Sequence, residues 1–200
     1  MSYSQFNLEN VQSELGIQIQ DRWNLFSDIP PVNYSDLLTQ LLAQYSPLAI
    51  AIGTEKSRSE FIIAPILFEL KQQLSGQISL FSGKEFNVEP IRGLTGFCDF
   101  LISRSPEQLL IKSPVIAVVE AKNDNIASGI GQCIAEMVAA QIFNERRQNS
   151  TSTVYGAVTT GSIWKFLQIN GTVVEADLDE YYLNDVGKVL GILKHCASQE

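Results

Sequence analysis

The stretch that decides the fold spans residues 115–122 and reads Val-Ile-Ala-Val-Val-Glu-Ala-Lys. Its first five residues are all apolar and mostly β-branched. They predict a central strand covered on both faces, because a strand with one solvent face alternates apolar and polar residues. Glu120 and Lys122 end the strand two residues apart, so their side chains point to the same side. A carboxylate and an ammonium group are therefore expected together at the end of a buried strand.

A second strand is expected over residues 96–103, and Asp99 lies within its apolar run. An ionised carboxylate in such a strand is costly unless it is paired or binds a cation. If the two strands are antiparallel neighbours, Asp99 can face Glu120, with Cβ atoms roughly 5 Å apart. A divalent cation between them would relieve their repulsion, and magnesium prefers one or two carboxylates with water and phosphate. The alternative is a buried ion network that only joins the two strands.

Two further residues of this stretch could take part in such a site. The backbone carbonyl of Ala121 could supply another oxygen ligand, because this small residue lies between Glu120 and Lys122. Lys122 would then polarise a metal-bound water or stabilise the charge that develops on a phosphate. The sequence therefore places a candidate metal site and its lysine in one short segment.

The remaining elements predict an α/β sandwich, with a central mixed sheet flanked by helices. Apolar residues at helical spacing predict helices, and alternating or apolar runs bounded by turn residues predict strands. Pro65 predicts a kink or a late start in the first long helix. We expect one domain over residues 1–200, on which residues 1–50 pack as a helical extension. The expected helices are 6–17, 34–45, 54–74, 126–147 and 184–196, and the other strands are 77–81, 86–89, 153–160, 163–170 and 173–174.

Composition excludes several classes of protein. The absence of an apolar run of about 18 residues predicts no membrane span, and the first five residues do not resemble a secretory signal. Cys98, Cys133 and Cys196 are odd in number and widely spaced, which argues against disulfides or a zinc knuckle and favours the cytoplasm. His195 is the one histidine, so Ser-His-Asp and His-rich metal chemistry are not expected.

The two strand motifs resemble a known signature. Read in order, they match the G-h-h-D … E-h-K pattern of the PD-(D/E)xK nuclease superfamily, in particular its RecB-like members, and the likeness covers residues 57–155. The proline of the family's name is absent. The resemblance implies a restriction-endonuclease-like fold and a nuclease that uses Mg²⁺ or Mn²⁺ to hydrolyse phosphodiester bonds, most simply in DNA. The matching residues are Gly96-Phe97-Cys98-Asp99 and Glu120-Ala121-Lys122.

The resemblance implies roles for two more side chains. A helix before the sheet often carries a glutamate that completes the metal site in this superfamily, and Glu60 matches it. Glu60 could instead close a capping box with Ser57. On the helix after the E-h-K strand, Gln132 occupies the glutamine position of the Q-x-x-x-Y pattern, whereas Glu136 stands where tyrosine is expected. Gln132 could also be a solvent-facing helix residue.

The charge balance shapes the expected partners. A net charge of −8 argues against strong autonomous DNA binding, because non-specific binding rests on contacts from Lys and Arg to phosphates. We expect nucleic acid to bind weakly, with a homodimer or protein partner as possible support, and no membrane partner. The alternative function is a catalytically silent nuclease-fold module of a defence or repair complex.

Overall fold

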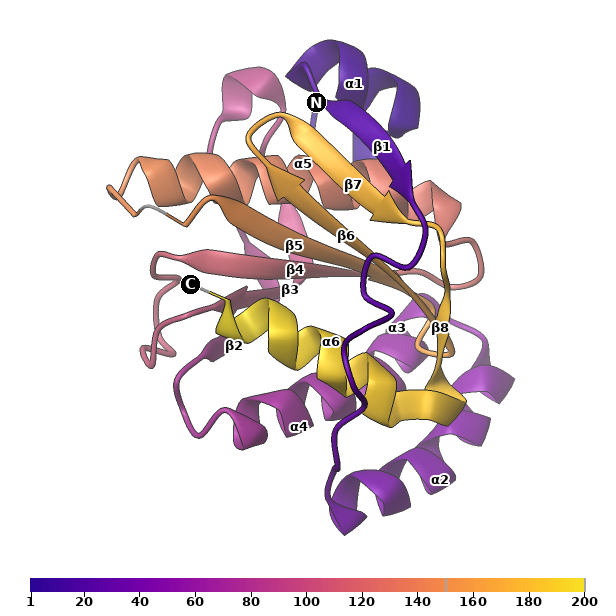
Figure 1. The fold of residues 1–200 in the computed structure, drawn as a ribbon. Coiled ribbons are helices and arrows are strands. Elements are labelled where there is room, and N and C mark those ends of the chain that lie inside the picture. Colours follow the sequence, from indigo (N-terminus) through magenta and orange to yellow (C-terminus); the bar gives the residue numbers. More distant parts are fainter. Residues whose placement is uncertain (150, 200) are drawn as a thin grey trace.

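The computed structural model describes residues 1–149 and 151–199, and its centre is an eight-stranded mixed sheet (Figure 1). The strands follow the order β1-β7-β6-β5-β4-β3-β2, and the short β8 pairs with β6. Their bounds are β1 Gln18–Arg22, β2 Ser79–Glu85, β3 Phe97–Ser103, β4 Val115–Ala121, β5 Thr153–Thr159, β6 Ile163–Asn170, β7 Val173–Asp177 and β8 Tyr181–Tyr182.

The pairing of β4 explains its sequence. It runs antiparallel to β3 and parallel to β5, and every one of its residues is buried. The parallel pair requires a crossover, which α5 (Ala127–Glu145) provides. The expectation of a doubly covered central strand is therefore confirmed, as is the broader expectation of an α/β fold with a mixed sheet between helices.

Helices cover both faces of the sheet (Figure 1). On one face, α5 packs on β4 and β5, with α1 (Leu8–Leu15) against it. On the other, α4 (Ala64–Gln73) and α6 (Val186–Ser198) pack on β2 and β4. The apolar core is correspondingly divided into two clusters, one on each side of the sheet. Residues of α2 (Asp36–Ile52) and α3 (Glu55–Arg58) extend the α4 side.

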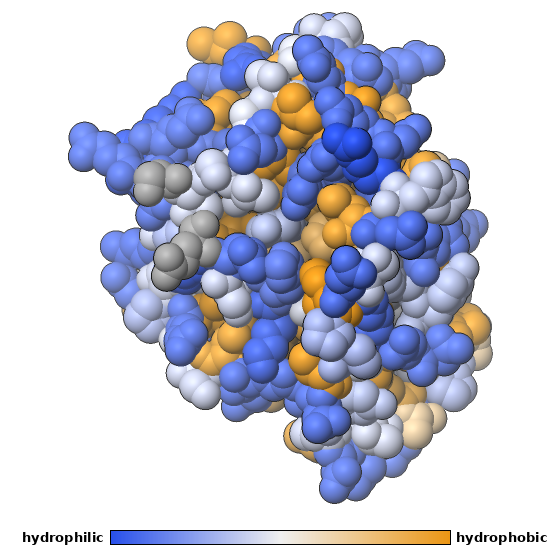
Figure 2. Space-filling view, in the orientation of Figure 1, coloured by the Kyte–Doolittle hydropathy of each residue, from blue (hydrophilic) through white to orange (hydrophobic). Residues whose placement is uncertain are grey.

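The surface that α6 helps to form carries its apolar residues in separate small groups between polar ones (Figure 2). No helix in the described ranges is long and apolar enough to cross a membrane. Short helical turns complete the chain at Tyr3–Gln5, Pro90–Arg92 and Leu183–Asp185.

Residues 1–50 contribute a strand to the sheet as well as helices packed on it. Residues 18–22 form β1, which pairs in parallel with β7 at the sheet edge. Helix α2 does not end before Pro47 but continues to Ile52, where Gly53 caps it in a left-handed conformation. Pro47 removes one helical N–H, and the carbonyl it would have bonded belongs to Ala43, an exposed residue that water can reach.

Two other boundaries differ from expectation. The expected strands 77–81 and 86–89 are replaced by a single strand, β2, which runs through Ser82 and Gly83 because all of it pairs with β3. The expected helix 54–74 is interrupted by a π-helical turn, Ser59–Ile63, directly before Pro65. A π turn shifts the hydrogen-bond pattern where a proline lacks its donor, so the expected irregularity at Pro65 is present in this form.

Residues 23–35, which connect β1 to α2 and are called the strap below, are bound to α6 through one lysine. The Lys188 ammonium group donates to the carbonyls of Phe26 and Ser27, each at 2.8 Å, and to that of Ile29. The strap also passes so close to the helix that a Cβ on Gly191 would lie 2.3 Å from the carbonyl oxygen of Pro30. The lysine is thus a donor to three carbonyls outside strands and helices, of which that of Phe26 also accepts a hydrogen bond from the Ile29 N–H.

Lys188→Met should therefore lower the free energy of unfolding by about 1–3 kcal/mol, since it removes a charged donor from three carbonyls, two of them in partly buried contacts. Urea unfolding followed by circular dichroism would measure the loss. Lys194→Met, on the same helix, removes the same charge and serves as the matched control. Equal effects of the two substitutions would contradict a specific role for the strap contacts.

Candidate active site

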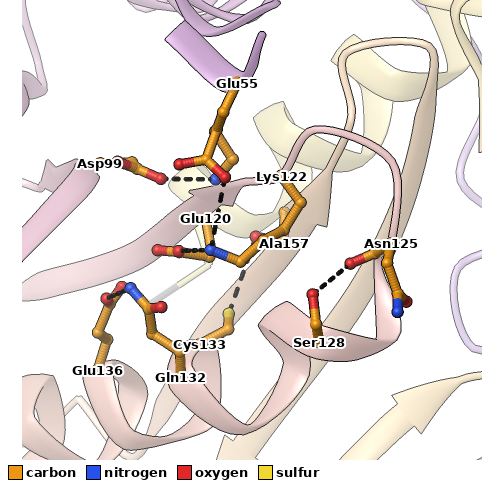
Figure 3. Close-up of polar contacts among 11 residues, drawn as sticks. Glu55, Asp99, Glu120, Lys122, Asn125, Ser128, Gln132, Cys133, Glu136 and Ala157 are labelled. Carbon is orange, nitrogen blue, oxygen red and sulfur yellow. Dashed lines mark hydrogen bonds and ion pairs between the residues drawn. The ribbon is translucent and has the colours of Figure 1, made fainter. Parts of the chain in front are cut away.

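The two acidic strand residues meet at one end of the sheet. The β3–β4 ladder pairs Phe100 with Val119, so Asp99 lies one step further along, beside Glu120. The Asp99 carboxylate accepts a hydrogen bond of 2.8 Å from the backbone N–H of Ala121 (Figure 3). The antiparallel neighbour relation expected from the sequence is therefore present, and it brings the two carboxylates together.

Glu120 is the most deeply covered of these groups, with 1% of its surface exposed. One carboxylate oxygen accepts a hydrogen bond from the Lys122 ammonium group, as the i, i+2 spacing predicts. The other oxygen is buried and has no hydrogen-bond partner. An unpartnered buried carboxylate oxygen is costly, and it marks a position where a donor or a cation would be stabilised.

Burial controls the protonation of the two carboxyl groups. Burial, followed by the neighbouring charge of Asp99, raises the pKa of Glu120 to about 8, although Lys122 opposes the shift. The pKa of Asp99 is also raised, mainly by burial, although the Ala121 N–H and Lys122 counteract this. Both groups therefore hold a proton more tightly than they would in water.

Lys122 is positioned by its surroundings as well as by Glu120. Burial works against its ammonium form, but the carboxylates of Glu120, Glu55 and Asp99 outweigh it and raise the lysine pKa. The first turn of α5 lies directly over its side chain. A Cβ on Gly129 would be 3.0 Å from two carbons of Lys122 and 2.7 Å from Val158. The helix therefore approaches the sheet so closely that residue 129 has no room for a side chain.

A cleft of about 250 Å³ opens beside Asp99, between the start of the first long helix and the end of β2. Glu60 lines this cleft as expected, but its carboxylate forms an ion pair with Lys56 at 2.6 Å. It does not close a capping box with Ser57, because Thr54 caps the helix instead. The lining residues are Glu55, Lys56, Ser59, Glu60, Ser82, Gly83, Asp99 and Ala121.

Glu55 belongs to the site although the sequence did not single it out. Its carboxylate lies 3.9 Å from the Lys122 ammonium nitrogen and points toward it (Figure 3). Burial raises the pKa of Glu55, with Asp99 adding to the shift and Lys122 opposing it. Glu55 could have been found from the sequence because it lies in the first helical turn after Thr54. It precedes Glu60 by five residues on a helix already expected to face the sheet.

Gln132 and Glu136 lie on α5 beneath Glu120 (Figure 3). The Gln132 amide donates to Glu136 at 3.1 Å, and Glu136 is fully buried with its other carboxylate oxygen unpartnered. Burial, followed by the charge of Glu120, raises the pKa of Glu136 well above its usual range. Gln132 is therefore not a solvent-facing residue, but its partner here is Glu136.

The carboxylates lie close together, but each of them is bonded to a donor from the protein. Among residues 1–149 and 151–199, no three or more His, Cys, Asp or Glu side chains are already arranged to hold a metal ion. Asp99 is bonded to a backbone N–H, Glu120 to Lys122 and Glu60 to Lys56. Binding a cation would require at least one of these side chains to turn from its present partner.

Comparisons with models of known protein families and with curated protein sequences found no match to this chain.

The stability of the protein should fall as pH rises from about 4.5 to 8, because Glu120 ionises near 4.5 in the unfolded chain but near 8 in the folded one. The folded state binds the extra proton in that window, and it loses this advantage when the pH exceeds the folded pKa. Urea unfolding across the pH range would show the slope. Glu120→Gln should flatten it, and Glu14→Gln, on the exposed side of α1, should not; an unchanged slope in Glu120→Gln would contradict the assignment.

Proposed function

We propose that this protein is a metal-dependent nuclease of the PD-(D/E)xK type, hydrolysing phosphodiester bonds, most simply in DNA. The observation that carries the proposal is the meeting of Asp99, Glu120 and Lys122 at the ends of two adjacent antiparallel strands, beside an open cleft. Buried acidic residues with a lysine are expensive for stability, and a catalytic role explains why they are gathered in one place.

The arrangement of elements supports a restriction-endonuclease-like fold. The acidic strands β3 and β4 form an antiparallel pair, and α5 then crosses to β5, which lies parallel to β4. A long helical segment that carries Glu55 and Glu60 precedes the sheet, and it opens onto the same cleft. This order is the one that the sequence resemblance implies, with the π turn as a local variation.

The donor set fits Mg²⁺ or Mn²⁺. These ions prefer carboxylate and carbonyl oxygens, and the unpartnered oxygen of Glu120 is a buried acceptor of that kind. Asp99 and Glu120 would hold the ion, with the Ala121 backbone and a carboxylate from the first helix as further oxygen donors. When bound, the ion would lower the pKa of a water molecule and neutralise charge on a phosphate.

The side chains of the chain itself then have separate tasks. Lys122, held by Glu120 and packed under Gly129, stays protonated and presents a positive charge to the phosphate that is attacked. Glu55 lies within reach of that ammonium group and limits its movement on the cleft side. The Gln132–Glu136 pair lies on α5 beneath Glu120, so the site lies between α5 and the first helix.

The second candidate function is a nuclease-fold module without turnover. It is favoured by the present engagement of Asp99, Glu120 and Glu60 with protein donors, and by the net charge of −8. In that case the same residues would form an ion network that joins β3, β4 and the first helix. The two functions differ in their response to divalent cations.

The nuclease proposal predicts that Lys122→Ala lowers cleavage of a labelled DNA substrate by at least roughly 100-fold, because it removes the charge beside the phosphate. The same variant should still bind Mn²⁺, since an ammonium group is not a ligand. Asp99→Ala and Glu120→Ala should lose both cleavage and binding, measured by gel assay and isothermal titration calorimetry. Absence of Mn²⁺ binding and cleavage in the wild type would support the silent module instead.

Glu55 and Glu60 can be separated by matched substitutions. We expect Glu55→Gln to weaken Mn²⁺ binding by roughly 10–100-fold, because its carboxylate already faces Lys122 and Asp99. Glu60→Gln should change it by less than about 3-fold, because Glu60 is half exposed and held by Lys56, a surface pair of small energy. The opposite ranking would restore Glu60 to the role that the sequence resemblance implies.

A further inference from the structure

Helix α2 has two apolar sides, and the core uses only one of them. Leu38 and Ala49 are buried, and Leu42 packs partly against the same core cluster. A second apolar row at helical spacing runs along the outer side. In it Leu37 is 58% exposed and Leu48 and Ile52 are each 48% exposed, while Leu41 is half-buried. A helix with a second apolar row facing water lacks a partner for that row.

A groove adjoins the first half of this outer row. It has a volume of about 500 Å³ and runs between α2 and α4, with Leu37, Leu41, Pro65 and Phe68 among its lining residues. Phe68 is 52% exposed and extends the apolar surface across to α4.

We propose that the outer row of α2, Leu37, Leu41, Leu48 and Ile52, is the interface through which two copies of this chain form a two-fold symmetric dimer. The proposal does not rest on the nuclease function. Its first support is the spacing of the row, which is four, seven and four residues. That pattern reads the same from either end, as an antiparallel pair of identical helices related by a two-fold axis requires.

The axis would pass between Gln44 and Tyr45. Leu37 of one copy would then pack on Ile52 of the other, and Leu41 on Leu48, because each pair is equidistant from that point. Gln44 is exposed at the centre, where its amide could pair with the same amide of the second copy. A single polar residue at the centre of an apolar helix pair fixes its register.

Area and charge favour a second copy over an unrelated partner. Four or five large side chains, about half exposed along a helix roughly 25 Å long, form an apolar patch on the order of 500 Å². Two such patches bury on the order of 1,000 Å², which is the lower range for specific association. Asp36 is the only charged residue of α2, so two chains of charge −8 meet there with the least repulsion.

Sedimentation equilibrium over a wide range of protein concentration tests the dimer. The wild type should shift from the mass of one chain to that of two as concentration rises, and Leu48→Glu should stay monomeric at every concentration. Leu109→Glu, which adds the same charge at a 91% exposed leucine outside α2, is the control and should dimerise like the wild type. A wild type that remains monomeric, or a Leu48→Glu variant that still dimerises, would overturn the proposal.

A cysteine at the proposed axis tests the geometry without disturbing the apolar row. Gln44→Cys should form an intermolecular disulfide under mild oxidation, because the two copies of residue 44 face each other; the three native cysteines are buried. Leu109→Cys is the matched control and should cross-link much less. Equal cross-linking of the two variants would show that contact between copies does not occur through this row.

Discussion

Glu120 ends the most deeply covered strand, with one carboxylate oxygen held by Lys122 and the other without a partner. This interaction is the one around which the end of the sheet is arranged. A carboxylate in that position is tolerated only with charges of opposite sign close by, and Lys122 supplies one. The lysine in turn needs space, which Gly129 leaves in the first turn of α5. The buried carboxylate of Glu120 therefore requires Lys122 beside it, and Lys122 requires a glycine at position 129 of the crossover helix.

Much of this end of the molecule could be predicted from the sequence because its signals are local. The apolar run of β4, the i, i+2 spacing of Glu120 and Lys122, and Asp99 within an apolar strand each follow from short-range rules. Residues that depend on packing were harder to find. Glu55 looks like an ordinary acidic residue in a first helical turn, and only the fold brings it within 3.9 Å of Lys122. Strand β1 starts in only a short alternating run, Ile17-Gln18-Ile19-Gln20, and it forms because β7 offers a free edge.

Prolines lie inside two helical segments. The end of α2 was wrongly expected before Pro47, whereas the irregularity expected at Pro65 is present as a π turn. In both places apolar residues beyond the proline pack against the core or an adjoining helix, and this packing outweighs the loss of one hydrogen bond. At Pro65 the π turn lies in the segment that lines the cleft, between Glu55 and α4, where such turns are frequent in proteins with a functional site.

Burial of the acidic groups around Lys122 lowers the stability of the folded protein. Asp99, Glu120 and Glu136 are each covered enough for burial to raise the carboxyl pKa. Apolar residues of similar size at these positions would pack into the same core without that penalty. Natural sequences depart from such local rules mainly where function requires it, and here Asp99 lines the cleft while Glu120 and Glu136 each have one buried oxygen without a partner. That grouping, more than any single carboxylate, is the physical basis on which we propose a function for this end of the sheet.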